Sequence, residues 1–132
     1  MSFHSGSANE KALNSFVTRY YRALEEDRSA VRAMYTDDAE VVWNSKPFPS
    51  VQALEEALRL MPAFKYHVTS TQIQEINPAV GQIPLSLVVV NGYVVGEAEN
   101  SIFSQTFHLA FQQQSVNDSC KVLIKLDRFC IF

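Results

Sequence analysis

Apolar and polar positions alternate with helical spacing in the first half of the chain. One stripe, at spacings of three, four and seven residues, consists of Leu13, Phe16, Val17, Tyr20, Tyr21 and Leu24. This stripe predicts an amphipathic helix. Residues 29–35 repeat the pattern briefly and predict a short second helix that ends in a turn at Asp37-Asp38. Ser50 is placed to cap a third helix, which Pro62 would stop.

The second half of the chain follows the period of two that is typical of strands. The expected strands are 40–44, 66–76, 85–90, 93–95, 102–114 and 121–132. Asn91-Gly92, between two of these segments, is compatible with a tight hairpin or with a bulge in one continuous strand. This order of elements predicts an α+β fold, in which three helices pack on one face of a strongly bent antiparallel sheet.

The two faces of this sheet differ in composition. In the strand from Phe103 to Phe111, the odd positions are large and belong against the helices, whereas the even positions are small and uncharged. Residues 76–96 and 100–117 contain no Asp, Glu, Lys or Arg, although a solvated face normally alternates charged residues with core residues. We therefore expect the outer face to be covered by a partner protein, with coverage by the chain itself or modest exposure as the alternative. The side chains predicted to contact the partner are Leu87, Val89, Thr106, His108, Ile124, Leu126, Arg128 and Cys130.

Composition narrows the functional classes. The chain has 132 residues, enough for one domain, and we expect residues 1–9 to be flexible. A net charge of -3 with scattered basic residues argues against nucleic-acid binding, and neither a secretory signal nor a membrane span is recognisable. Cys120 and Cys130 lie about 30 Å apart if they share a strand, too far for a disulfide. No motif suggests a metal ion or a cofactor.

Short motifs follow one another along nearly the whole chain. They are Phe16-Val17-x-x-Tyr20-Tyr21-x-x-Leu24, Asp27-Arg28, Met34-Tyr35, Val42-Trp43-Asn44, Leu60-Met61-Pro62 with Tyr66-His67-Val68, Leu87-Val88-Val89-Val90 with Gly92, Phe103-x-Gln105-x-Phe107, and Asp127-x-Phe129. Their order and spacing resemble nuclear transport factor 2 and its relatives, which implies a cone-shaped, cystatin-like roll.

Within that family, Val42-Trp43-Asn44 and the uncharged segment 87–92 look closer to the small mRNA export cofactor that pairs with the Tap-type export receptor. This resemblance implies a heterodimer with the receptor's own nuclear transport factor 2-like domain. It also implies support for docking to Phe-Gly nucleoporins, and a location in the nucleus, the cytoplasm and at pore complexes.

The homodimeric import carrier of Ran-GDP is an alternative within the same family. That carrier uses an acidic residue directly after the tryptophan and further acidic residues in a hairpin, whereas this chain has Asn44 at the first position, with Glu97 and Glu99 near the second. A neutral amide cannot replace the carboxylate's charge-assisted bond, so the export cofactor is favoured. Relatives also carry an interface Arg at the position of Cys130, and Arg128, two residues earlier on the same face, could take its place.

Isomerases and dehydratases of the same superfamily make an enzyme the second alternative. The candidate cavity residues are Tyr20, Tyr35, Trp43, Phe107, Asp127 and Phe129. Asp127 would be the general base or acid, while His67 and His108 fall on the outer face. A buried Asp is more often held by hydrogen bonds, so we expect a protein without catalytic activity.

Overall fold

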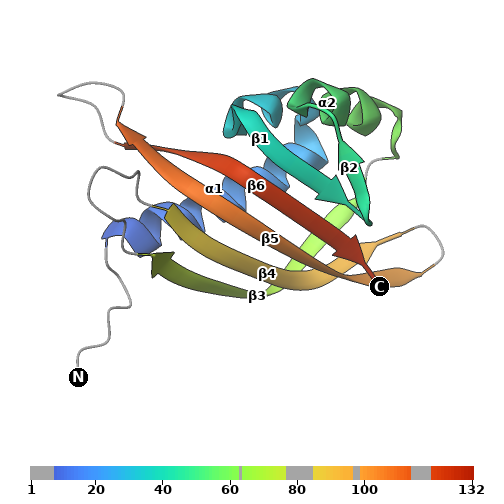
Figure 1. Cartoon of the computed structure of the whole chain (residues 1–132). Helices are drawn as coiled ribbons and strands as arrows, with labels where there is room; N and C mark the ends of the chain where they lie inside the picture. Colours follow the sequence, from blue (N-terminus) through green and yellow to red (C-terminus); the bar gives the residue numbers. More distant parts are fainter. Residues whose placement is uncertain (1–7, 63, 77–84, 97–98, 114–119) are drawn as a thin grey trace.

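The computed structural model describes residues 8–62, 64–76, 85–96, 99–113 and 120–132 (Figure 1). The elements, in chain order, are helix α1 (Ala8–Glu26), the short 3-10 helices η1 (Arg28–Ala30) and η2 (Arg32–Met34), strands β1 (Tyr35–Trp43) and β2 (Lys46–Phe48), helix α2 (Val51–Leu60), and strands β3 (Lys65–Ile76), β4 (Leu85–Val95), β5 (Asn100–Gln113) and β6 (Cys120–Ile131). The flexibility predicted for residues 1–7 concerns a segment outside the described residues, whereas residues 8 and 9 belong to α1.

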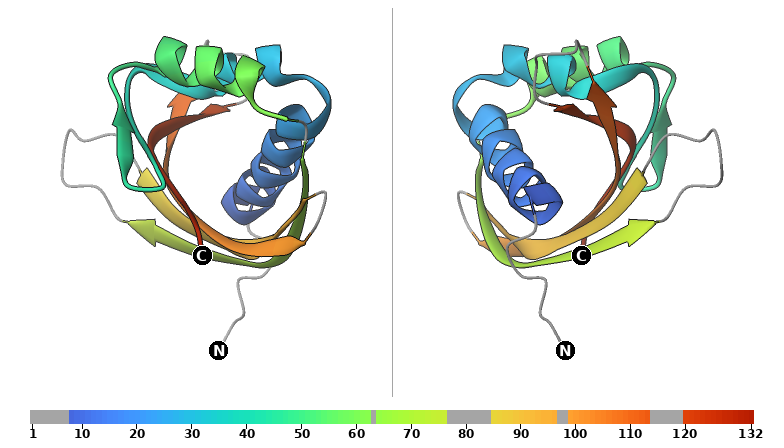
Figure 2. Two further views of the ribbon diagram at one scale, coloured as in Figure 1. Left: turned by 90° about the vertical axis from the view of Figure 1, so that its right-hand side faces the viewer. Right: turned by 90° about the vertical axis from the view of Figure 1, so that its left-hand side faces the viewer.

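The strands form one six-stranded sheet in the order β2-β1-β6-β5-β4-β3. Figure 2 shows this sheet curving around α1, with α2 and the 3-10 helices closing the cone on one side. The predicted α+β fold with helices on one face of a bent sheet is therefore confirmed. One pair departs from the prediction, because β1 and β6 run parallel while all other neighbours are antiparallel.

Several elements of the structure differ in type from the elements predicted from the sequence. The expected second helix is two 3-10 turns, and Asp37-Asp38, predicted as a turn, lies within β1. The short strand β2 was not predicted because it contains Pro47, which a sheet tolerates here because β2 is an edge strand. β4 runs without interruption through Asn91-Gly92, and the irregularity lies in the neighbouring strand, between Val68 and Ser70.

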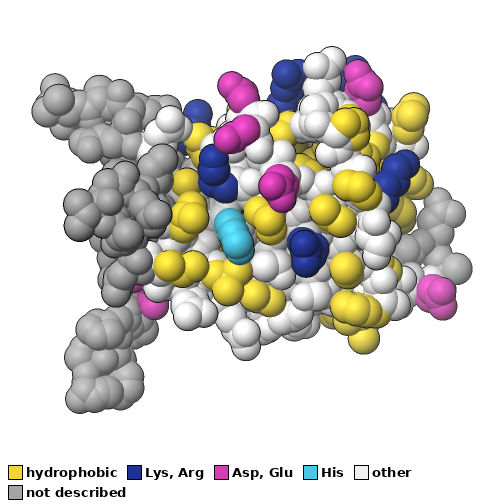
Figure 3. Space-filling view, in the orientation of Figure 1, with side chains coloured by type: hydrophobic (Ala, Val, Ile, Leu, Met, Phe, Trp, Pro, Cys, Tyr) yellow, Lys and Arg dark blue, Asp and Glu magenta, His cyan; other side chains and the backbone are white. Residues whose placement is uncertain are grey.

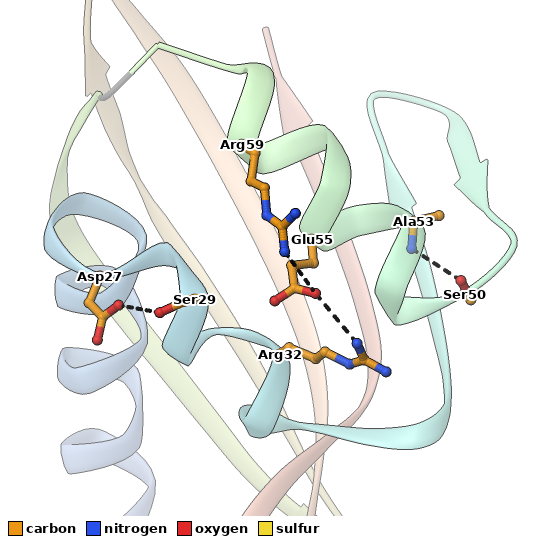
Figure 4. Close-up of polar contacts among 7 residues, drawn as sticks. All are labelled: Asp27, Ser29, Arg32, Ser50, Ala53, Glu55 and Arg59. Atoms are coloured by element: carbon orange, nitrogen blue, oxygen red, sulfur yellow. Dashed lines mark hydrogen bonds and ion pairs between the residues drawn. The ribbon is translucent and has the colours of Figure 1, made fainter.

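Helix α2 begins at its predicted cap (Figure 4). The Ser50 hydroxyl oxygen accepts a hydrogen bond from the backbone N–H of Ala53 at 3.1 Å, which satisfies one of the free donors of the first turn. On its exposed side, the Glu55 carboxylate lies 3.5 Å from the guanidinium of Arg32 and 3.8 Å from that of Arg59. The first contact joins α2 to η2, although such exposed ion pairs contribute little to stability.

Arg28 caps the other end of α2. Its guanidinium donates to the backbone carbonyls of Leu58, Met61 and Pro62, the second at 2.5 Å. These carbonyls include acceptors that a helix C-terminus leaves unpaired, and a cation is favourable there. Arg28, whose Nε also donates to the Leu24 carbonyl at 3.3 Å, therefore joins α2 to the end of α1.

Aromatic and aliphatic side chains fill the cone. The residues with at most 1% of their surface exposed include Leu13, Phe16, Tyr20 and Leu24 from α1, and Phe103, Phe107 and Leu109 from β5. The helical stripe and the odd row of β5, both predicted from periodicity, thus pack against each other. Each such side chain contributes about 1.5–3 kcal/mol to folding.

Candidate partner-binding face and buried aspartate cluster

The outer face of the sheet is built from residues paired across five strands. One row consists of Glu40, Leu126, His108, Leu87 and Gln74, and the next row consists of Val42, Arg128, Thr106, Val89 and Gln72. We call this surface the outer face. Figure 3 looks onto it and shows hydrophobic side chains spread among few charged ones.

Most side chains predicted to contact a partner lie on the outer face and are partly exposed. They are Leu87, Val89, Thr106, His108, Leu126, Arg128 and Cys130. No described helix or strand packs over them, because the helices occupy the concave side of the sheet (Figure 2). The Arg128 guanidinium makes no hydrogen bond or ion pair with another residue in the described part of the chain. The face thus offers a partner apolar side chains together with two exposed charged groups, the Glu40 carboxylate and the Arg128 guanidinium.

Ile124 was wrongly assigned to the outer face. Its side chain is 0% exposed and lies in the core. The cause is a register shift: His108 pairs with Leu126, but the next residue of β5, Leu109, pairs with Ile124. Lys125 is an extra residue in β6. It shifts the alternation of side chains by one position, so the residues before it, including Ile124, face the opposite side of the sheet from the side that simple alternation predicts.

One end of the outer face is strongly apolar. Ile102 and Phe132 are 64% and 79% exposed, and the Phe132 N–H donates to the Ile102 carbonyl at 2.9 Å, so these two side chains lie next to each other. Tyr93 pairs with Ile102 and stacks on His67 with ring centroids 4.6 Å apart. A contiguous exposed patch of this kind is typical of a protein-binding surface.

The residues predicted to line a cavity come together inside the cone around Asp127. The Oδ2 atom of Asp127 accepts hydrogen bonds from the Tyr35 hydroxyl at 2.6 Å and from the Trp43 indole at 2.8 Å. The Oδ1 atom accepts from Gln105 at 2.7 Å, and the Tyr20 hydroxyl lies 3.4 Å from Oδ2. These partners come from α1, β1 and β5, so the cluster ties the first helix to the centre of the sheet.

Phe107 and Phe129 surround this cluster with apolar surface. The Phe107 and Tyr20 rings meet edge to face with their centroids 5.0 Å apart, and the centroids of the Phe129 and Trp43 rings are 4.7 Å apart. Gln105, which the sequence placed in the core but not in the cluster, links Asp127 to α1, because its Oε1 accepts from the Tyr21 hydroxyl at 2.5 Å. Gln105 faces inward within an otherwise apolar row of β5, and this position is the sequence feature that indicates a buried hydrogen-bonding role.

Burial controls protonation in the cluster. It raises the pKa of Asp127, although the hydrogen bonds from Gln105, Tyr35 and Trp43 act in the opposite direction. Burial, and then the charge of Asp127, also raise the pKa of Tyr20 and Tyr35 well above the usual tyrosine value, so both hydroxyls stay protonated. No buried polar side-chain atom in the described residues lacks a hydrogen-bond partner.

This arrangement favours a structural role for Asp127. The carboxylate is 0% exposed, and its acceptors are already used by the chain's own donors. A general base needs a reacting atom within hydrogen-bond reach, and here that space is filled. Within the described residues, no group of three or more His, Cys, Asp or Glu side chains could hold a metal ion, and no helix is long and apolar enough to cross a membrane.

Asn44 has a local structural function. Asn44 and Ser45 have φ values of 53° and 67° and form the two-residue turn between β1 and β2, where asparagine is favoured. The Asn44 Oδ1 atom accepts from the Ile131 N–H at 2.8 Å, which attaches this turn to β6. Glu99 is exposed, and Glu97 lies outside the described residues.

Comparison with known proteins places this geometry in a family. A family model described as the nuclear transport factor 2 (NTF2) domain matches residues 12–126. NTF2-related export protein 2 from Bos taurus is 26% identical over 121 residues, which cover 90% of this chain and 85% of the bovine protein, and the Homo sapiens protein matches with the same identity and coverage.

Solved structures show the same fold at lower identity. The yeast UBP3-associated protein BRE5 gives a TM-score of 0.76 at 18% identity, over 96% of this chain and 98% of that one. Ntf2 from Cryptosporidium parvum gives 0.73 at 21% identity, over 93% and 94% of the two chains. A chain of the C. albicans Mtr2-Mex67 M domain complex gives 0.66 at 9% identity, over 94% of each chain. Because the family model matches most of its length, the chain belongs to the nuclear transport factor 2 (NTF2) domain family.

Proposed function

We propose that this chain is a non-enzymatic mRNA export cofactor that forms a heterodimer with a Tap-type mRNA export receptor. The outer face of its sheet contacts the receptor's own NTF2-like domain. The observation that carries this proposal is the outer face, which is poor in charge and is not covered by any described element of the chain. The apolar side chains of this face are stabilised by removal from water, and the curved sheet of the receptor domain is the surface that covers them in this proposal.

The comparisons support the same role. The curated relatives carry the name export protein, and one structural neighbour comes from a complex between Mtr2 and the M domain of Mex67. In the proposed heterodimer, the receptor supports docking to Phe-Gly nucleoporins, so the pair passes between nucleus and cytoplasm through pore complexes. Direct contact with nucleic acid, membrane or a cofactor has no part in this proposal.

Two alternatives are less well supported. A Ran-GDP carrier would use an acidic residue after Trp43, whereas Asn44 is neutral and its side-chain oxygen is used by β6. An enzyme would use Asp127, whose acceptor atoms are occupied within the core. Incubation of the purified chain with Ran-GDP, followed by size-exclusion chromatography, tests the first alternative, and a stable complex would favour it.

The substitution Leu126→Glu tests the heterodimer. A carboxylate at this partly exposed position would lose its water on pairing without gaining a partner, so we expect at least about 100-fold weaker binding to the co-expressed receptor domain. Leu60→Glu is the matched control, because Leu60 is 89% exposed on α2, away from the outer face. Binding is measured by calorimetry. Equal affinity of Leu126→Glu and the unmodified chain would refute the proposed interface.

A further inference from the structure

A pocket of about 300 Å³ opens at one end of the outer face. We call it the notch, and it is lined by Thr36, Asp37 and Asp38 from β1, Ala110, Phe111 and Gln112 from β5, and Leu123 and Lys125 from β6. Ala110 pairs with Leu123 one step beyond the register shift, two residues from His108. The notch is therefore continuous with the row that contains His108 and Leu126.

Two strand irregularities create the notch. β1 pairs with β6 at Tyr35 and Ile124 and again at Glu40 and Leu126, so four residues of β1 stand opposite the single residue Lys125. The surplus backbone of β1 forms a wall beside the outer face. Hydrogen bonds hold this wall in place, because the Asp38 carboxylate accepts from the Lys125 ammonium at 3.1 Å and from the Thr36 hydroxyl at 2.9 Å.

The floor and the rim of the notch differ in chemistry. Ala110 and Leu123 form an apolar floor and are only 5% and 9% exposed, although they stand on the outer side of their strands. Asp37 and Asp38 bring two carboxylates to the rim against the one ammonium of Lys125. The hydrogen bonds from Thr36 and Lys125 lower the pKa of Asp38, and Asp37 is exposed without an ion pair to another described residue. The rim thus holds two carboxylates and one ammonium, and Asp37, which also lines a neighbouring pocket with Arg32, makes no ion pair with that guanidinium.

We propose that the notch binds an arginine side chain of the same partner protein that covers the outer face. The aliphatic stem of this arginine lies on Ala110 and Leu123, and its guanidinium pairs with the carboxylate of Asp37. This inference rests on the proposed heterodimer and adds a specificity contact to it.

An arginine matches both halves of the notch. Long basic side chains bury their methylene groups on apolar surface and keep the charged head in water, which is the order of floor and rim found here. Arginine also forms planar, two-point hydrogen bonds with carboxylates, which the ammonium of lysine cannot do. A purely apolar side chain would cover Ala110 and Leu123 but would leave the Asp37 carboxylate without a partner next to a surface from which water has been removed.

Two substitutions test this assignment by calorimetry against the co-expressed receptor domain. Ala110→Phe fills the floor, and we expect about tenfold weaker binding. Asp37→Asn removes the rim charge, and we expect about threefold weaker binding and a smaller loss of affinity between low and high salt. Ala30→Phe in η1 and Glu56→Gln on α2 make comparable changes at exposed positions outside the notch, and both should bind like the unmodified chain.

The outcomes separate this inference from the heterodimer itself. If Leu126→Glu abolishes pairing but both notch variants bind normally, the notch assignment is wrong and the proposed function stands. If Ala110→Phe weakens binding while Asp37→Asn changes neither affinity nor salt dependence, an uncharged side chain occupies the notch and the arginine is refuted. Asp37→Asn alone decides the question if Ala110→Phe fails to fold, because Asp37 is exposed.

Discussion

Removal of the Asp127 carboxylate tests whether this buried group stabilises the fold or performs chemistry. Leucine at position 127 has a similar shape but no acceptor atom. The Tyr35 hydroxyl can then bond to the Tyr20 hydroxyl, which already lies 2.7 Å away. The Trp43 indole N–H and one N–H of the Gln105 amide lose their acceptor, and both are buried, while the Gln105 nitrogen keeps its second hydrogen bond, to the Tyr20 hydroxyl at 3.3 Å.

The expected cost follows from these two unpaired donors. Each buried donor without a partner costs about 1–3 kcal/mol, so Asp127→Leu should lower the free energy of unfolding by about 2–6 kcal/mol. This is a large part of the stability of a typical domain. Asp127→Asn keeps one acceptor oxygen and should cost less, because the side chains of Gln105 and Tyr35 can reorient around the new amide.

The stability difference between the unmodified chain and Asp127→Asn should depend on pH with a definite sign. Burial raises the pKa of Asp127 in the folded state above its unfolded value of about 3.9. The stabilisation that this group contributes is therefore fully present below about pH 4 and is lost as the pH rises through the folded pKa. The difference in unfolding free energy between the unmodified chain and Asp127→Asn should fall as pH increases.

Urea denaturation, followed by the fluorescence of the single tryptophan and by circular dichroism, measures these differences. Asp37→Asn makes the same chemical change at an exposed position and should alter stability by less than about 0.5 kcal/mol. A structural Asp127 predicts that Asp127→Asn still binds the receptor domain. An Asp127→Leu variant as stable as the unmodified chain, or a stability difference for Asp127→Asn that grows with pH, would refute this reasoning.

Two further substitutions probe how the cone is held together. Arg28→Ala should destabilise the chain by about 1–3 kcal/mol, because three backbone carbonyls at the end of α2 lose their hydrogen bonds to the guanidinium and only that of Leu58 keeps another donor, the Met61 N–H. Arg22→Ala on the exposed side of α1 is the control and should change the stability little. Equal urea midpoints for the two variants would contradict the capping role. Gly92→Ala should lower the free energy of unfolding by about 1–3 kcal/mol or more, because the added methyl carbon would lie 2.0 Å from the His67 carbonyl oxygen and 3.0 Å from the Phe103 ring. An unchanged thermal unfolding temperature would show that β3 can move away from the new methyl group.

Local periodicity determined a large part of this structure. The stripe at residues 13–24, the Ser50 cap and the odd row of β5 each depend on neighbours within a few residues, and all three formed as predicted. The same alternation placed Leu87, Val89 and Leu126 on the outer face and Asp127 inside. Polarity patterns of this kind record which side of an element meets water.

Only the tertiary structure decided the features that depend on pairing between distant segments. The bulge at Lys125 moved Ile124 into the core and Leu123 to the outer side, and no residue type near it marks the shift. The same bulge and the surplus residues of β1 produced the notch, and the donors to Asp127 were collected from three other elements. Strand register is set by the neighbouring strand and by the volume of the packed core, so a single extra residue changes the facing of all positions on one side of it.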